Sequence, residues 1–342
     1  MTRIKIVKPG LFTTIQDRGR WRYQRFGIPV AGAMDDFATR VANILIGNNE
    51  YEAVLENTFL GPEIAFRCDE IISITGANMK PRINGEYVPM WTSLLVKAGD
   101  ILSFSNAITG LRSYIAFSKG LDVPEIMGSK STFTRGGLGG YKGRKLESGD
   151  EIKLGNRELS NLGSYLSSKF IPIYKKEESI RIIMGPQDDY FTEETKEGFL
   201  NSKYTITPES DRMGYRLDGP KIIHKNGADI VSDGIVFGSI QVPGHGSPII
   251  MMADRATTGG YTKIATVITP DLHKLAQMSP GNSIDFRSIS LEEAHEIYKE
   301  YENKLIEIKD IISKNKFEFD KIKKLNVKIN EVSYSVDLRE IK

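Results

Sequence analysis

The sequence has a single cysteine, Cys68, among its 342 residues. One cysteine forms neither an internal disulfide nor a thiolate zinc cage, and its apolar neighbours indicate a buried strand residue rather than a nucleophile. The sequence also lacks an apolar run long enough to span a membrane, and its first residues lack the apolar core of a signal peptide. We therefore expect a cytoplasmic protein that does not contact a membrane.

The sequence also has no large excess of positive or negative charge. The sequence has 46 Lys and Arg against 44 Asp and Glu. A nucleic-acid-binding protein concentrates basic charge, so this balance argues against a nucleic-acid partner. The hydrophobic share of 40% is ordinary for a globular protein, and the length suffices for two cores and a tail.

Several signatures of known chemistry are absent from the sequence. It has no phosphate-binding Gly-x-x-x-x-Gly-Lys-Ser/Thr loop and no Gly-x-Ser-x-Gly elbow. The glycine-rich segment 135–141 is not a dinucleotide fingerprint. The histidines show no metal-ligand spacing. They are His224, His245, His273 and His295.

Short strands separated by turns fill most of the sequence, which has 32 glycines. The segments 94–104, 145–154 and 275–286 each indicate a strand, a Gly-Asp or Gly-Asn turn and a second strand. Their recurrence in both halves predicts two related β lobes, 1–155 and 180–288, joined by a polar linker, 156–179.

Helices are few. The spacing of apolar residues predicts one helix over 35–47, with Asp35 as its N-cap and Gly47 at its end. A capping box of Ser290 and Glu293 begins a second helix with a narrow apolar seam. We favour packing of this seam on the protein's own body over pairing with a partner helix. A hairpin that turns at 330–331 completes a tail over 289–342.

Two polar segments precede the first helix. In 13–20, Asp17 lies between residues that can bind an anionic substrate, although a solvated turn explains the same charges and is favoured for this segment alone. In 27–35, a glycine-rich loop exposes backbone N–H groups at the helix start, which suits an anion. A simple N-cap role for Asp35 is the favoured interpretation there.

Two further polar segments lie in the second half. In an extended 211–217, Arg212, Gly214 and Arg216 share one face, so the two guanidinium groups either bind an anion or pair with nearby acids. In 241–261, Asp254 is a candidate base or metal ligand beside hydroxyls and paired glycines. His245, between two glycines, is expected to be an exposed turn residue.

These segments occur in the same order in a known family. The motifs at 14–20, 27–35, 212–217, 240–244 and 254–261 resemble the family of 5-oxoprolinase C subunits. This family is also described as KipA-like, as allophanate hydrolase subunit 2, or as biotin-dependent carboxyltransferase. The resemblance extends over roughly the first 290 residues. The chain departs from the family pattern at Ala256 and Thr262.

The resemblance implies a mainly β fold of tandem cyclophilin-like β-barrel lobes. It also implies ATP- and Mg²⁺-dependent opening of the 5-oxoproline ring to L-glutamate, together with two partner proteins, one KipI-like and one LamB/YcsF-like. Phosphorylation of the lactam oxygen makes an unreactive amide open to water, and this chemistry needs cations and an acid or base.

The residues that the resemblance assigns to this reaction follow the motifs. Asp17 and Asp254 are implied as catalytic groups. Substrate and phosphate binding is implied for Gln16, Arg18, Arg20, Arg212, Gly214, Arg216, Gln241, Thr257, Thr258, Gly259, Gly260 and Tyr261.

Two other functions remain open at this point. The chain also resembles the transferase half of a biotin-dependent urea or amide carboxylase, and a KipA-like regulator that binds a KipI-like kinase inhibitor. The C-terminal hairpin is not followed by an Ala-Met-Lys-Met site, so we expect no covalent biotin.

Overall fold

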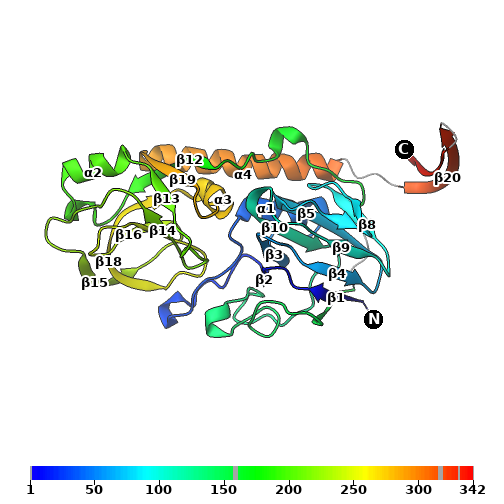
Figure 1. The fold of residues 1–342 in the computed structure, drawn as a ribbon, viewed down its shortest axis with the longest axis horizontal. Coiled ribbons are helices and arrows are strands. Elements are labelled where there is room, and N and C mark those ends of the chain that lie inside the picture. The colour runs from blue at the N-terminus through cyan, green and yellow to red at the C-terminus, as the bar shows by residue number, and fades with distance from the viewer. Residues whose placement is uncertain (1, 157–160, 315–318, 330–331, 342) are drawn as a thin grey trace.

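The computed structural model describes residues 2–156, 161–314, 319–329 and 332–341. Two β-rich lobes lie side by side, and the long helix α4 (Leu291–Lys314) runs along both of them (Figure 1). The fold is mainly β with few helices, as the sequence predicts. Among the described residues, none of the helices is both long and apolar enough to cross a membrane.

The N-terminal lobe is built from two sheets. The six-stranded sheet has the order β11-β1-β4-β9-β6-β7, and the five-stranded sheet has the order β2-β3-β10-β5-β8. Their strands are β1 (Arg3–Lys8), β2 (Phe12–Gln16), β3 (Val54–Thr58), β4 (Glu63–Phe66), β5 (Glu70–Asn78), β6 (Arg82–Ile83), β7 (Glu86–Tyr87), β8 (Ser93–Val96), β9 (Ile101–Ser103), β10 (Thr109–Phe117) and β11 (Glu151–Lys153). Alternating apolar residues, such as Ile4 and Ile6 of β1, fill the core of this lobe.

The C-terminal lobe is a closed barrel. Its strands follow the order β12-β19-β13-β14-β17-β16-β18, and β18 pairs with β12 to close the ring. The strands of this lobe are β12 (Glu177–Met184), β13 (Tyr204–Ile206), β14 (Gly214–Asp218), β15 (Asp229–Gly234), β16 (Ser239–Val242), β17 (Ile249–Met251), β18 (Thr258–Val267) and β19 (Ser283–Ser288). Strand β15 continues the sheet beyond β18.

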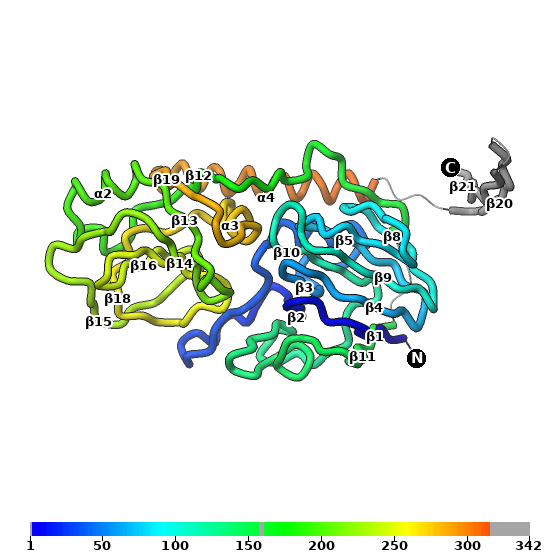
Figure 2. The backbone as a smooth tube through the Cα atoms, viewed as in Figure 1, coloured from blue at the N-terminus to red at the C-terminus, as the bar shows by residue number. Residues whose placement is uncertain are grey.

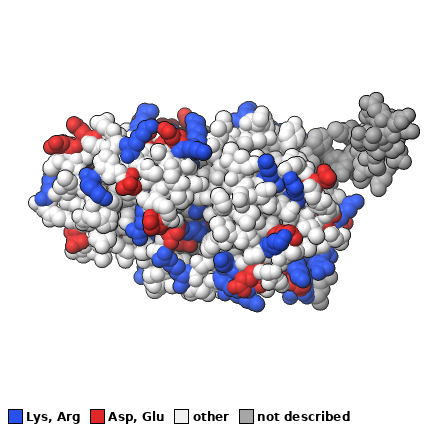
Figure 3. Space-filling model, viewed as in Figure 1, with Lys and Arg blue, Asp and Glu red and all other residues white. Residues whose placement is uncertain are grey.

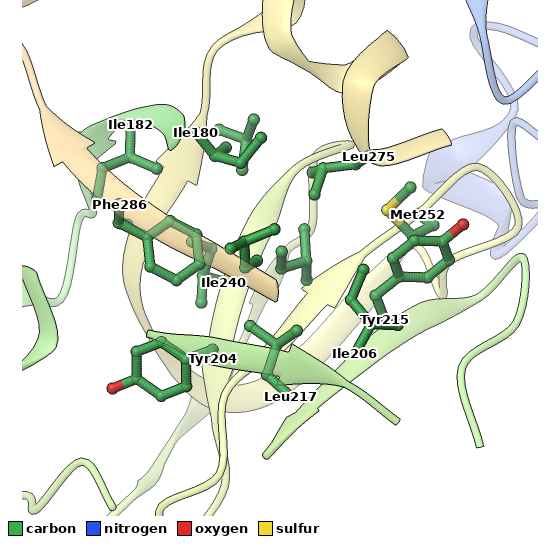
Figure 4. Packing of buried hydrophobic residues seen from close by; sticks show 14 of the residues in the cluster. Ile180, Ile182, Tyr204, Ile206, Tyr215, Leu217, Ile240, Met252, Leu275 and Phe286 are labelled. Atoms are coloured by element: carbon green, nitrogen blue, oxygen red, sulfur yellow. The ribbon is translucent and has the colours of Figure 1, made fainter. Parts of the chain in front are cut away.

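Large apolar side chains fill the barrel. Figure 4 shows Tyr204, Phe286 and Leu217 pointing toward one another between strands from distant parts of the sequence. Met34, which comes from the N-terminal half of the chain, belongs to the same buried cluster. The N-terminal half therefore contributes a side chain to the barrel core.

The predicted repeats are only partly correct. In 94–104, β8 and β9 are both strands, but they belong to different sheets. In 145–154 and 275–286, only the second arm is a strand, because β11 and β19 follow the turns while helix α3 (Leu272–Ala276) contains the start of the third segment. A Gly-Asp or Gly-Asn turn marks where a strand begins and does not specify what precedes it.

Two smaller predictions also need correction. Cys68 lies in a bend after β4 rather than in a strand, and it is half-buried against the core of the N-terminal lobe. The last residues of the predicted linker form the start of β12, which begins at Glu177 and pairs in the barrel.

The first predicted helix is confirmed as α1 (Asp36–Leu45). The carboxylate of Asp35 accepts a hydrogen bond from the backbone N–H of Ala38 at 2.9 Å, which caps the helix. The chain turns away at Gly47, whose φ of +76° favours glycine. Helix α1 is buried between the N-terminal lobe and α4.

Helix α4 packs on the protein's own body, as favoured from its seam. Leu305, Ile308 and Ile312 join the buried cluster around α1. Arg40 of α1 donates to both carboxylate oxygens of Glu302, at 2.7 and 2.9 Å. The backbone N–H of Glu293 donates to the Ser290 hydroxyl at the start of the helix.

The predicted C-terminal hairpin is confirmed at the level of the strands. Strands β20 (Phe319–Ile329) and β21 (Val332–Ile341) pair antiparallel, with Ile329 opposite Val332. The predicted turn at 330–331 lies outside the described residues. In the part of the chain that Figure 2 colours, β1 and β11 lie side by side at the edge of the N-terminal lobe. Helix α2 (Glu193–Leu200) is a separate short helix of the barrel lobe.

Asp35 is expected to make stability depend on pH. Burial raises the pKa of this carboxyl to about 7, so between about pH 4 and 7 the folded chain holds a proton that the unfolded chain has lost. The contribution of Asp35 to the free energy of unfolding therefore increases as pH falls from 8 to 5. Urea unfolding of Asp35→Asn should show a weaker pH dependence, whereas Asp122→Asn, at an exposed site, should match the unmodified protein. An unchanged slope in Asp35→Asn would contradict this.

Candidate functional site

A buried arginine joins the two lobes. Arg212, just before β14, donates to both oxygens of Asp254 at 2.9 and 3.0 Å. It also pairs with Glu56 of β3 and donates to the carbonyl of Gly32 at 2.6 Å, both in the N-terminal half. The three charged residues are at most 7% exposed. A guanidinium thus satisfies two carboxylates in a place with little access to water.

The electrostatics of this cluster follow from its burial. Burial by itself lowers the pKa of Arg212, but the carboxylates of Asp254 and Glu56 outweigh it, so this pKa is raised and the guanidinium stays charged. Burial raises the pKa of Asp254, and the Arg212 guanidinium opposes part of that rise. The carboxyl of Asp254 therefore takes up a proton at a higher pH than an ordinary aspartate does.

A chain of hydrogen bonds links this cluster to α1. The hydroxyl of Tyr114 donates to Glu56 at 3.0 Å and accepts from the backbone N–H of Asp35 at 2.9 Å. The amide of Gln277 donates to the Asp35 carboxylate at 2.7 Å, and its oxygen accepts from the backbone N–H of Arg112 at 3.0 Å. The interface between the lobes is thus polar and almost fully hydrogen-bonded.

A cleft of about 510 Å³ lies beside the Arg212 cluster. Both lobes contribute to its walls, which are largely apolar, with several polar groups. Its lining residues are Leu11, Phe12, Thr58, Phe59, Leu111, Arg112, Thr134, Arg135, Ile206, Ser210, Asp211, Arg212, Met213, Tyr215, Asp254, Met278, Ser279 and Pro280. An apolar cleft with a few convergent polar groups is the usual form of a small-molecule site.

Two arginines of the cleft come from the N-terminal lobe. Arg112 donates to the Tyr215 hydroxyl at 2.6 Å and to the carbonyl of Ala276 at 2.7 Å, while its buried Nε has no hydrogen-bond partner among the described residues. Arg135 reaches across to Asp211 of the barrel lobe at 2.8 Å and is 61% exposed. Arg112 is therefore a buried cation with a spare donor, and the Arg135–Asp211 pair lies in contact with solvent.

The first predicted segment lies within the N-terminal lobe, where its carboxylate is hydrogen-bonded. Asp17 accepts hydrogen bonds from the backbone N–H groups of Gly19 and Lys130 and from the hydroxyls of Ser129 and Ser131. These bonds attach the 129–131 loop to the end of β2. The carboxylate of Asp17 is thus fully hydrogen-bonded within its own lobe, and it does not line the cleft.

The other residues of that segment also act within the N-terminal lobe. Arg20 is fully buried and donates to the carbonyls of Ile126 and Ser131 at 2.9 and 2.8 Å. The Gln16 amide donates to the carbonyl of Thr132 at 3.1 Å. Arg18 is exposed, with its guanidinium 4.5 Å from the centre of the Tyr51 ring. None of these three lines the cleft.

The third predicted segment is divided by burial. Strand β14 turns Tyr215 and Leu217 into the barrel and Arg216 outward, so Arg216 is exposed while Arg212 is buried at the interface. The two guanidinium groups therefore do not form one anion site. Gly214 is buried, and a Cβ at this position would lie 2.9 Å from the side chain of Ile249, so the glycine is required by strand contact.

From the fourth segment, Asp254 lines the cleft. Gln241 of β16 is buried, with its Nε2 lacking a hydrogen-bond partner among the described residues. A Cβ at Gly259 would approach that Nε2 to 2.7 Å. The residues Thr257, Thr258, Gly260 and Tyr261 are not among those that line the cleft, and Thr258 and Tyr261 are exposed on β18.

His245 is exposed, as expected, and its Nδ1 accepts from the backbone N–H of Ser247 at 3.2 Å. No group of three or more histidine, cysteine or acidic residues that could hold a metal ion occurs in the described ranges.

Sequence reasoning gave no role to several charged residues of the interior, among them Glu56, Arg112, Arg255 and Lys263. Glu56 and Arg112 belong to the site described above. Arg255 is buried on backbone carbonyls, with Nε donating to Ile235 at 3.2 Å, and Lys263 is buried against Asp233. A charged residue within an apolar strand, as in Val54-Leu55-Glu56, was the available signal.

Lys and Arg lie interspersed with Asp and Glu over the face shown in Figure 3. This agrees with the near balance of 46 basic and 44 acidic residues. This face therefore has no broad basic surface of the kind that binds a nucleic acid.

Comparison with known proteins identifies the class of fold and site. Residues 26–288 match the family model described as carboxyltransferase domain, subdomain A and B. The chain therefore belongs to this carboxyltransferase-domain family. Among curated proteins, it is 36% identical to the C subunit of 5-oxoprolinase from Escherichia coli over 293 residues, which cover 85% of this chain and 93% of that relative.

Two larger relatives contain the same unit as one part. The chain is 35% identical to the urea amidolyase of Saccharomyces cerevisiae, with 86% of this chain and 17% of that relative covered. The solved urea amidolyase structure of K. lactis matches with a TM-score of 0.85 at 31% identity. That match covers 90% of this chain and 20% of the other, so the chain spans about a fifth of that protein.

Removal of the Arg212 side chain is expected to loosen the two lobes. Arg212→Ala leaves Glu56 and Asp254 buried without a counter-charge, which should reduce the free energy of unfolding by about 3–5 kcal/mol. Urea unfolding monitored by circular dichroism measures this loss. The matched control, Arg216→Ala on exposed β14 surface, should change stability by less than about 0.5 kcal/mol. Equal losses in the two variants would refute the role given to Arg212.

Proposed function

We propose that this chain is the C subunit of an ATP-dependent 5-oxoprolinase. The observation that carries the proposal is coverage: the match extends over 93% and 95% of the corresponding 5-oxoprolinase subunits of Escherichia coli and Haemophilus influenzae. The urea amidolyase of yeast matches over only 17% of its length. The matched region thus includes nearly the whole of the 5-oxoprolinase subunit and a small part of the larger enzyme.

The inter-lobe cleft suits a small substrate with one carboxylate. The proposed reaction transfers the γ-phosphoryl group of ATP to the lactam oxygen of 5-oxoproline, after which water adds to the same carbon. The ring C–N bond then breaks as the nitrogen takes a proton, which leaves γ-glutamyl phosphate, and a second water displaces its phosphate. One ATP, two waters and one 5-oxoproline thus become ADP, phosphate and L-glutamate.

Residues of the cleft fit separate parts of this reaction. Arg112, with its spare Nε, is suited to the substrate carboxylate. Asp254, whose pKa burial raises, is suited to exchange a proton with the ring nitrogen or with water. Arg212 holds Asp254 in place through two hydrogen bonds and is a positioning residue. In this proposal Asp254 acts alone as the acid or base, without Asp17.

Two partner proteins complete the proposed enzyme. A KipI-like protein and a LamB/YcsF-like protein would supply the remaining ligands for Mg²⁺ and ATP, because the described residues hold no metal-binding group of their own. We place the complex in the cytoplasm, where ATP is available. The chain itself would carry no covalent biotin.

Reconstitution tests the proposal directly. This chain, co-expressed with its KipI-like and LamB/YcsF-like partners, should release glutamate from 5-oxoproline only with ATP and Mg²⁺, and omission of this chain should abolish the activity. Arg112→Met should raise the KM for 5-oxoproline at least tenfold through loss of a charged hydrogen bond, while Arg216→Met at the exposed site should leave it unchanged. A folded three-protein complex without activity would refute the proposal.

The second candidate is a carboxyltransferase role, which the likeness to urea amidolyase favours. The urea carboxylase structure of Kluyveromyces lactis also favours it, with a TM-score of 0.85 at 28% identity. In that role the cleft would receive a carboxyl group from a separate biotin carrier. Transfer of labelled carboxylate from carboxybiotin to urea by this chain would favour it over 5-oxoproline opening.

The absence of attached biotin is expected in either role. The chain should give no streptavidin signal after expression with biotin ligase, since no Ala-Met-Lys-Met site occurs in the sequence. A biotinylated band at the mass of this chain, 38.3 kDa, would contradict the expectation.

A further inference from the structure

A second cavity, of about 430 Å³, lies where the inter-lobe segment, α1, α3 and α4 meet. We call it the junction pocket. It shares no lining residue with the inter-lobe cleft. Figure 1 shows α4 running over α1 and α3, which belong to different halves of the molecule. The pocket is thus built from all the parts whose relative position defines the cleft.

Aromatic rings form one wall of the junction pocket. Phe37 of α1 has its ring centroid 6.1 Å from that of His273 on α3 and 6.2 Å from that of Tyr301 on α4. The rings of His273 and Tyr301 are 6.3 Å apart and inclined by 27°. Burial lowers the pKa of His273 to about 4, so its ring is neutral near pH 7. A wall of neutral rings favours a flat apolar group.

Positive charge surrounds the same cavity. Lys304 of α4 is half-buried, with Nζ 4.9 Å from the centre of the Phe37 ring, and forms no ion pair with the described residues. Lys175 lines the pocket from the inter-lobe segment and likewise has no ion pair among them. Lys274 is already paired with Asp271 at 3.0 Å, and Glu178 is the one acid among the lining residues.

The imbalance at Lys304 needs a counter-charge. Burial lowers the pKa of this amine, and the carboxylate of Glu307, which pairs with Lys169, offsets only part of this effect. An anion in the cavity would offset that cost through charge-assisted hydrogen bonds from Lys304 and Lys175. The aromatic wall favours a flat ring, and the two amines favour an anionic group on the same ligand.

We propose that the junction pocket binds a small aromatic anion: a flat ring that carries a phosphate or a carboxylate. The ring packs against Phe37, His273 and Tyr301, and the anionic group lies at Lys304 and Lys175. This site is separate from the proposed reaction and does not depend on it.

The pocket also connects with the interface between the lobes. Tyr174 lines the cavity, and its hydroxyl donates to the Asp35 carboxylate at 3.4 Å. The backbone N–H of Asp35 donates to the hydroxyl of Tyr114, this hydroxyl donates to Glu56, and Glu56 pairs with Arg212. An occupant that contacts α1, α3 and α4 at once therefore stabilises the docked lobes, and it should raise the melting temperature of the chain.

Titration calorimetry with phenyl phosphate tests the proposal on the full chain. One molecule should bind per chain, at least tenfold more tightly than inorganic phosphate, because the ring adds its own contacts. Benzoate provides the carboxylate form of the same probe. Tighter binding of phenyl phosphate indicates a phosphate as the natural group, tighter binding of benzoate indicates a carboxylate, and both support the pocket.

Variants locate the binding site. Lys304→Met should weaken phenyl phosphate binding at least tenfold, whereas Lys299→Met, an exposed position on the same helix, should leave it unchanged. Thermal unfolding checks that each variant is folded, and Lys175→Met at an exposed position replaces Lys304→Met if that variant unfolds. Absence of phenyl phosphate binding at millimolar concentration, or binding lost in Arg112→Met but kept in Lys304→Met, would overturn the proposal.

Discussion

The guanidinium of Arg212 lies between two carboxylates from different lobes, and the rest of the arrangement depends on this contact. Asp254 belongs to the barrel lobe and Glu56 to the N-terminal sheet. Each of these charges would be costly to bury alone, so the three are stable only together. The lobes can therefore dock in one orientation, the one in which the guanidinium meets both acids.

That orientation also creates the inter-lobe cleft. The residues around the Arg212 cluster are held by Tyr114, Asp35 and Gln277, which continue the polar contacts toward α1. Polar networks of this kind are favourable only when nearly every member has a partner. The buried Nε of Arg112 is an exception in this region, and an unpaired buried donor is a position at which an ordered water or a ligand can be bound.

Local signals in the sequence were sufficient for several elements. The Asp35 cap, the apolar spacing of α1 and the Ser290 cap, which accepts from the backbone N–H of Glu293, act over one or two helical turns, and all three are present in the structure. Strand pairing was harder to predict. The Gly99-Asp100 turn separates β8 from β9, yet these strands join different sheets, because a turn sequence does not encode the partner of a strand.

The sequence by itself determined the mainly β class, the two lobes, the capped helices and the order of the motifs, since these depend on neighbours in the chain. Only the tertiary structure decided which charges meet. Asp17 bonds to its own lobe at Ser129, whereas Arg212 pairs with Glu56, which lies 156 residues away. Electrostatic attraction depends on distance in space and on burial, and neither quantity can be measured along the sequence.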